Sequence, residues 1–174
     1  RTHWEGFDAA TRAVALGEVV FNTSMTGYQE ILTDPSYAGQ LVAMTYPMVG
    51  NYGVNAEDAE SARPWAAGLI VRELARLHNN WRAEESLDAY LRRTGVAGIT
   101  GLDTRALARH IREAGAMRAA IAPASEPPDD VMERILAHPP MAGLDLTARV
   151  TTEAAYEVEP VGEERFHVIA YDFG

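Results

Sequence analysis

The sequence predicts a layered domain of mixed α/β class. Six runs rich in Val, Ile, Phe and Thr have the length and composition of strands. They lie at residues 17–23, 40–46, 68–73, 95–100, 117–122 and 165–171. Several runs, such as Leu69-Ile70-Val71, are apolar at successive positions, which is typical of strands covered on both faces. Three amphipathic segments between these runs can supply the covering helices.

The first predicted helix begins after Ser86 and ends at Gly95. A serine hydroxyl can accept a hydrogen bond from the free N–H groups of a first helical turn, and glycine commonly ends a helix. Leu87, Tyr90 and Leu91 are spaced to form its apolar face.

The second predicted helix has Asp103 or Thr104 as its N-cap and ends at Gly115. Its inward face consists of Leu107, Ala108 and Ile111. A third helix is expected between Pro127-Pro128 and Pro139-Pro140, with Asp129 and Asp130 favourable at its positive N-terminal end and Val131, Ile135 and Leu136 as its apolar residues.

Residues 151–164 differ in character from the rest of the chain. Five glutamates accumulate there around Pro160 and Gly162, without a sustained apolar period. We therefore expect a domain over residues 1–150, an acidic linker over 151–164, and the start of a further α/β domain over 165–174. The chain opens at Arg1 without an initiator Met or a secretory leader, so we interpret it as a segment of a longer protein.

The composition excludes several classes of function. The formal charge of −10 disfavours nucleic acid and anionic membrane surfaces as partners, and no apolar run approaches the ~20 residues of a membrane-spanning helix. The chain contains no cysteine, so it has no thiol nucleophile and no disulfide. Its five histidines lack the spacing of a metal site, and we expect no metal.

Other catalytic patterns are also absent from the sequence. No phosphate-binding loop or nucleophile elbow occurs, and neither Ser24 nor Ser36 has an identifiable base nearby in sequence. Acidic clusters such as Glu57-Asp58-Glu60 are expected to be solvated surface. We therefore expect no catalytic residue in this chain.

The segment 21–37 is the densest group of hydroxyls, amides and aromatics in the chain. It joins two apolar strands, with Gly27 free to adopt an unusual backbone angle and Pro35 preset for a turn. Two interpretations remain open from these residues. The segment is either a structural loop held by local hydrogen bonds or a binding loop on a rigid scaffold.

Residues 17–37 resemble the N-terminal domain of the small subunits of carbamoyl phosphate synthetases throughout. The resemblance continues at Thr45-Tyr46-Pro47, Asn80-Trp81-Arg82, Asp103-Thr104-Arg105 and Val168-Ile169-Ala170-Tyr171-Asp172-Phe173-Gly174. It covers nearly the whole chain. It implies a three-layer β/β/α swivelling domain, followed by the first strand of a class I glutamine amidotransferase domain.

The resemblance also implies a function. In this family the amidotransferase domain releases ammonia from glutamine through a Cys-His-Glu triad, and a large subunit uses that ammonia with bicarbonate and ATP to make carbamoyl phosphate for arginine and pyrimidine biosynthesis. None of the triad residues lies in this chain, whose expected role is a docking and glutamine-pocket scaffold. The expected partner is the cytoplasmic large subunit, which carries ATP and Mg²⁺, and this chain is expected to hold no cofactor.

Carried over to this sequence, the family's substrate contact is Ser36, which is expected to approach glutamine bound between the two domains. Asp34 and Tyr37 are expected to shape its turn, and Asn22, Thr23 and Thr26 are weaker candidates for holding the loop. Family members usually open with a strand before the region matching Arg1, so the first strand is expected to be missing. The alternatives are a hydrolase that uses Ser24 or Ser36 and an independent non-catalytic protein-binding module.

Overall fold

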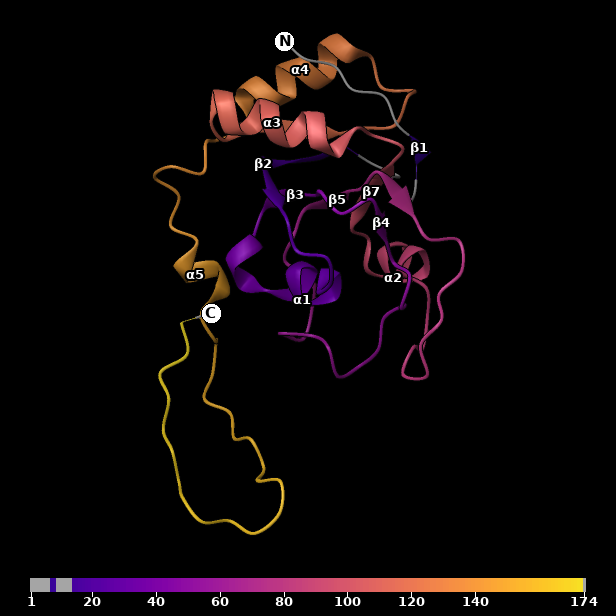
Figure 1. The fold of residues 1–174 in the computed structure, drawn as a ribbon. Helices are drawn as coiled ribbons and strands as arrows, with labels where there is room; N and C mark the ends of the chain where they lie inside the picture. The colour runs from indigo at the N-terminus through magenta and orange to yellow at the C-terminus, as the bar shows by residue number, and fades with distance from the viewer. Residues whose placement is uncertain (1–6, 9–13, 174) are drawn as a thin grey trace.

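A mixed six-stranded sheet forms the centre of the molecule (Figure 1). The computed structural model describes residues 7–8 and 14–173. In spatial order the strands are β1 (Phe7–Asp8), β7 (Ala97–Thr100), β5 (Gly68–Ile70), β3 (Gln40–Met44), β2 (Ala15–Asn22) and β8 (Met117–Ile121). The four inner strands are parallel, and the two edge strands are antiparallel to their neighbours. The α/β class predicted from the sequence is confirmed.

The strands are apolar at successive positions because both faces of the sheet are buried. Along β3, Leu41 and Ala43 join one core cluster, while Val42 and Met44 join a second cluster on the opposite face. All four side chains are at most 1% exposed. Side chains alternate between the faces of a strand, so a strand between two helical layers needs apolar residues throughout.

The helices cover the two faces of this sheet (Figure 1). On one face lie α3 (Thr104–Ala114) and α4 (Pro128–Ala137). On the other lie α1 (Tyr28–Thr33) and α2 (Leu87–Thr94), together with a small parallel sheet of β4 (Met48–Val49) and β6 (Glu73–Leu74). Within the described ranges, none of the helices combines the length and the apolar character that crossing a bilayer needs.

The predicted helix boundaries are confirmed by their caps. Ser86 Oγ accepts a hydrogen bond from the N–H of Ala89 at 3.1 Å, and α2 ends at Gly95, whose φ is 75°. Asp103 Oδ1 accepts from the N–H of Ala106 at 3.0 Å, so Asp103 is the N-cap of α3. The third predicted helix is α4, although no residue of α4 is buried.

One prediction of secondary structure is wrong, and a second is not confirmed in this chain. The run at 68–73 is divided between β5 and β6, which pair in different sheets. The run at 165–171 forms no strand, and its side chains are exposed. A strand is stable only when its N–H and C=O groups are paired, and no described segment pairs with these residues. A fifth short helix, α5 (Thr147–Val150), precedes the region 151–173, which contains neither helix nor strand.

A close backbone approach fixes the start of β3 against β2. A Cβ atom at Gly17 would lie 2.4 Å from the carbonyl oxygen of Gly39, so no larger residue fits there without movement of the backbone. Gly39 follows the turn that carries Ser36. Glycine at position 17 therefore allows β2 and the end of that turn to pack together.

Candidate functional site

The polar segment 21–37 is mostly regular structure rather than an open loop. The chain leaves β2, forms α1 and then a 3₁₀ turn, η1 (Pro35–Tyr37), before it enters β3. Gly27 precedes α1 with φ 83°, a left-handed conformation that favours glycine. Its N–H donates to the Tyr52 hydroxyl at 2.6 Å.

Stacked tyrosines hold the start of α1 in the core. The rings of Tyr28 and Tyr52 have centroids 4.3 Å apart and an interplanar angle of 20°. The Tyr28 hydroxyl donates to the carbonyl oxygen of Gly53. Burial raises the pKa of both phenols above the ordinary value of 10.0. The two hydroxyls therefore stay protonated near neutral pH and can take part in these hydrogen bonds.

The turn that carries Ser36 is held at both ends. Asp34 Oδ1 accepts a hydrogen bond of 2.8 Å from the N–H of Ser36. Asn22 Nδ2, at the end of β2, donates to the Tyr37 hydroxyl at 3.0 Å. Ser36 itself is exposed, and its hydroxyl makes no hydrogen bond with any part of the chain that the structure describes. The geometry thus places a free hydroxyl on a fixed turn at the surface.

The segment 60–66 holds the end of α1 just before this turn. Thr33, only 1% exposed, accepts at Oγ1 from the N–H of Glu60 at 2.9 Å. The Ser61 hydroxyl donates to the carbonyl oxygen of Thr33 at 2.6 Å and accepts from Trp65 Nε1 at 3.0 Å. These bonds restrict movement of α1 relative to the neighbouring segment, and so of the turn after it.

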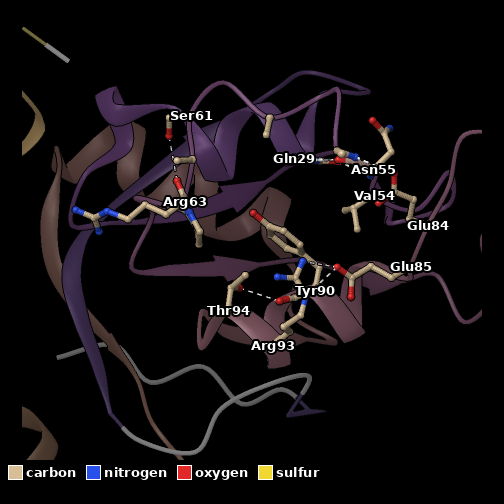
Figure 2. Close-up of a pocket in the computed structure, with 14 residues that line it drawn as sticks. Gln29, Val54, Asn55, Ser61, Arg63, Glu84, Glu85, Tyr90, Arg93 and Thr94 are labelled. Atoms are coloured by element: carbon tan, nitrogen blue, oxygen red, sulfur yellow. Dashed lines mark hydrogen bonds and ion pairs between the residues drawn. The ribbon is translucent and has the colours of Figure 1, made fainter. Parts of the chain in front are cut away.

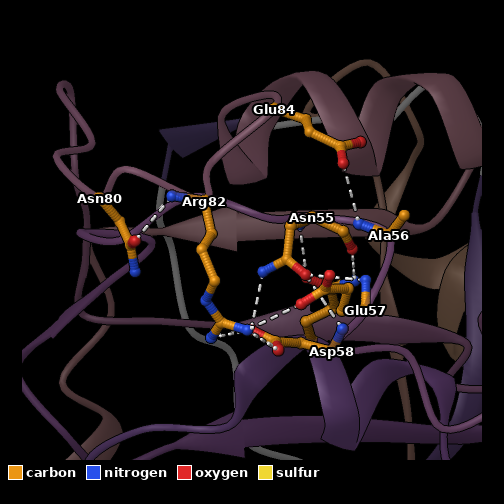
Figure 3. Close-up of polar contacts among 8 residues, drawn as sticks. Asn55, Ala56, Glu57, Asp58, Asn80, Arg82 and Glu84 are labelled. Atoms are coloured by element: carbon orange, nitrogen blue, oxygen red, sulfur yellow. Dashed lines mark hydrogen bonds and ion pairs between the residues drawn. The ribbon is translucent and has the colours of Figure 1, made fainter.

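A second polar network connects Gln29 of α1 to residues 55–58. Figure 3 shows the part of this network around Asn55, Asp58 and Arg82. The backbone N–H of Asn55 donates to Gln29 Oε1 at 3.0 Å, and the side-chain oxygen of Asn55 accepts from the N–H groups of Glu57 and Asp58. Arg82 donates to both carboxylate oxygens of Asp58, at 3.0 and 3.2 Å. The expectation that this acidic cluster is simply solvated is wrong for Asp58, because its side chain is only 19% exposed and is paired with Arg82.

A cavity of about 410 Å³ lies beside this network (Figure 2). Gln29 and Asn55 line one part of it, and Tyr90 and Arg93 of α2 line another. Arg93 is paired with Glu85, which also lines the cavity. Ser36 does not line this cavity, so the predicted substrate contact and the cavity are separate features.

The described residues provide no arrangement for nucleophilic catalysis. Neither the Ser24 nor the Ser36 hydroxyl is hydrogen-bonded to a histidine or carboxylate among them. Nor do the described parts of the chain contain a group of three or more His, Cys, Asp or Glu residues that could hold a metal ion. A serine nucleophile needs a positioned base, so the serine hydrolase hypothesis gains no support from the geometry.

Comparison with known proteins decides the family. A family model described as "Carbamoyl-phosphate synthase small chain, CPSase domain" matches residues 1–121, more than half of the chain. The chain belongs to the carbamoyl-phosphate synthase small-chain family. The resemblance noted in the sequence is therefore confirmed, and segment 21–37 lies inside the matched region.

Individual small chains show the same relationship. The carbamoyl phosphate synthase small chain of Synechococcus sp. is 47% identical over 182 residues, which cover 98% of this chain and 46% of the relative. That of Streptomyces avermitilis is 53% identical over 163 residues, covering 92% and 43%. That of Pseudomonas aeruginosa is 47% identical over 174 residues, covering 91% and 46%. The chain therefore spans less than half the length of these small chains.

One group of polar residues was missed by the sequence reasoning. Arg72, Arg105, Arg109 and Arg112 line a second cavity together with Thr23 and Thr45. The spacing of the last three arginines, at four and three residues, was the available signal, because residues so spaced share one face of a helix. Arg72 could be added only from the fold, because it comes from a different element.

Proposed function

We propose that this chain is the N-terminal part of the small subunit of a glutamine-hydrolysing carbamoyl phosphate synthetase. The complete enzyme would release ammonia from glutamine and use it, with bicarbonate and ATP, to make carbamoyl phosphate. Membership of the small-chain family over residues 1–121 supports this proposal. The chain contains no cysteine, so its own role is structural: it docks the amidotransferase domain and completes the glutamine pocket.

Ser36 is the residue we assign to glutamine. Its hydroxyl is exposed and unbonded within the described structure, while its backbone N–H is fixed by Asp34. If the hydroxyl served only to stabilise its own turn, a hydrogen bond within that turn would be expected. A free hydroxyl on a fixed turn instead suits contact with the charged α-carboxylate or α-amino group of glutamine, because it can both donate and accept.

Residues 165–174 are proposed as the first strand of the amidotransferase domain, reached through the linker 151–164. Phe166, Val168, Ile169 and Tyr171 are each at least 80% exposed. Four large apolar side chains so close together are unfavourable in water, and a neighbouring sheet would bury them. We further propose that residues 1–150 form the three-layer β/β/α swivelling domain of the family, with the β4–β6 pair in the layer that also holds α1 and α2.

The proposed partner of this domain is the large subunit in the cytoplasm, which would hold ATP and Mg²⁺. The domain has no catalytic group of its own in this account, so contact with the large subunit is its second task. A variant of the complete small subunit that lacks residues 1–150 should bind the large subunit more weakly than the complete subunit does. Calorimetric titration of the two purified subunits measures this difference.

The control is glutamine hydrolysis by the shortened subunit alone, which checks that its amidotransferase domain is folded. Undiminished affinity of a folded, shortened subunit for the large subunit would contradict the docking role. It would then favour the alternative, an independent protein-binding module.

A further inference from the structure

A second cavity, of about 480 Å³, opens where three parallel strands of the sheet end. Thr23 follows β2, Thr45 follows β3, and Arg72 lies two residues beyond β5. The N-terminal half of α3 contributes Thr104, Arg105 and Arg109. In α/β sheets, ligands commonly bind in the crevice beyond the carboxyl ends of parallel strands. Its volume lies within the range of small-molecule sites, about 300–1,000 Å³.

Four arginines line this cavity, and no Asp or Glu is among its lining residues. Arg72, Arg105, Arg109 and Arg112 form no ion pair with any residue that the structure describes. Other arginines behave differently: Arg82, Arg92, Arg93 and Arg134 each lie within 3.8 Å of a carboxylate oxygen. In a chain with a formal charge of −10, four guanidinium groups that have no ion pair with a described residue are a local reversal of the overall charge.

The spacing of the arginines on α3 places like charges close together. Arg105, Arg109 and Arg112 are four and three residues apart, so like charges are neighbours on one helix face. Arg105 also lies in the first turn, which contains no acidic residue and where the helix dipole disfavours a cation. A bound anion would offset both effects.

Thr104 adds a hydroxyl-bearing side chain to the lining of the cavity. The residue as a whole is only 1% exposed. The four arginines of the lining are exposed, so the charged groups lie at the open side of the cavity.

We propose that this cavity binds a small phosphate-bearing anion with at least two negative charges. Guanidinium groups bind phosphate oxygens through paired, charge-assisted hydrogen bonds. The hydroxyl-bearing side chains of Thr23, Thr45 and Thr104 add further polar groups around the same space. The site is distinct from the assigned glutamine contact, because Ser36 is not among the residues that line it.

The test is calorimetric titration of the full chain with inorganic phosphate, pyrophosphate and ATP as separate probes. The proposal predicts saturable binding of at least one probe, weakened by added salt because charge attraction is screened. The Arg109→Gln variant should bind that probe roughly ten- to a hundredfold more weakly, the effect of losing one charge-assisted hydrogen bond. The three probes distinguish a simple phosphate site from one that also requires a nucleoside.

Arg76→Gln is the matched control, because Arg76 is exposed, lies outside the cavity and has no ion pair with a described residue. Its affinity for the probe should equal that of the unmodified chain.

A second variant, Thr104→Val, preserves the side-chain shape and should weaken binding of the probe without preventing folding. Circular dichroism checks that this variant is folded. Absence of saturable binding at millimolar concentrations, or equal binding by the Arg109 and Arg76 variants, would overturn the proposal. The proposal would also be overturned if no probe binds and Arg109→Gln lowers the affinity for the large subunit. The cavity would then be a protein-docking surface.

Discussion

Asn22 and Tyr37 connect the carboxyl end of β2 to the turn that carries Ser36, through a hydrogen bond of 3.0 Å from Asn22 Nδ2 to the Tyr37 hydroxyl. Both residues are partly buried, and they are separated by 15 positions in the sequence. β2 is an inner strand of the sheet, so it is well suited to fix the position of a turn at the surface. Asn22 and Tyr37 therefore act as positioning residues for Ser36 in our account.

A double-mutant cycle measures this connection. Tyr37→Phe and Asn22→Ala should each destabilise the chain by about 0.5–1.5 kcal/mol, and the double variant should lose less than the sum, because one hydrogen bond is shared. The free energy of unfolding is measured by urea denaturation. Full additivity of the two effects would show that the hydrogen bond contributes nothing to stability.

The pair of Arg82 and Asp58 should be worth more than an exposed ion pair. Arg82→Ala leaves the Asp58 carboxylate, 19% exposed, without its charged partner. We expect a loss of about 1–3 kcal/mol in the free energy of unfolding. Arg92→Ala is the matched control, because its pair with Asp88 is 44% and 40% exposed and should contribute no more than about 0.5 kcal/mol. Equal losses in the two variants would contradict the structural role of Arg82.

Stability should fall at alkaline pH because burial raises the pKa of Tyr28 and Tyr52 above 10.0. A raised pKa means that the folded chain holds its phenolic protons more tightly than the unfolded chain does. The contribution to stability is complete below pH 10.0 and is lost as the pH rises toward the raised values.

The Tyr52→Phe variant isolates one of these phenols. It should lose about 1 kcal/mol at neutral pH, because the Gly27 N–H loses its acceptor, but its urea midpoint should fall less steeply above pH 10 than that of the unmodified chain. Tyr171→Phe, at an 88% exposed position, is the control for loss of a tyrosine. An unchanged slope in Tyr52→Phe would show that burial of this phenol does not control the alkaline loss.

Local signals in the sequence were sufficient for most of the fold. Ser86 and Gly95 cap α2, and Asp103 and Gly115 cap α3. Each cap acts within a few residues, so the ends of both helices could be predicted from neighbouring positions. The run of successive apolar residues in β3 also predicted a strand that is buried on both faces.

Helix α1 was missed because its stability comes from tertiary contacts. It has six residues, no side-chain N-cap and a glycine before it, and it is too short to form alone. Tyr28, Ile31 and Leu32 do have helical spacing, and that was the available signal. The site was only partly readable for the same reason. The turn that carries Ser36 could be predicted from Pro35, and the role of Ser36 stays a prediction. The bond from Asn22 to Tyr37 and the four arginines around α3 depend on distant segments meeting in the fold.

The chain of 174 residues should release no ammonia from glutamine. Attack on the glutamine amide in this family uses a cysteine thiolate, and the chain contains none. Ammonia release is measured with purified chain and excess glutamine, and the complete small subunit serves as the positive control. Turnover by the chain that survives stringent purification would contradict its assignment as a non-catalytic scaffold.

The assignment of Ser36 is tested most directly by Ser36→Ala in the complete synthetase. A hydrogen bond to a charged group contributes about 1.5–3 kcal/mol, so the variant should use glutamine roughly ten- to a hundredfold less efficiently. The contact is to the unreacting end of the substrate, and the loss should appear mainly as a raised KM. Ser24→Ala is the matched control, because Ser24 is an exposed serine of the same segment and its backbone N–H donates to Asn22 Oδ1.

The decisive measurement is therefore the steady-state KM for glutamine in the Ser36→Ala enzyme, with synthesis from added ammonia measured in parallel. Our account predicts a raised KM for glutamine, unchanged ammonia-driven synthesis, and no effect of Ser24→Ala on either. Equal impairment of glutamine-driven and ammonia-driven synthesis by Ser36→Ala, or impairment of neither, would contradict it.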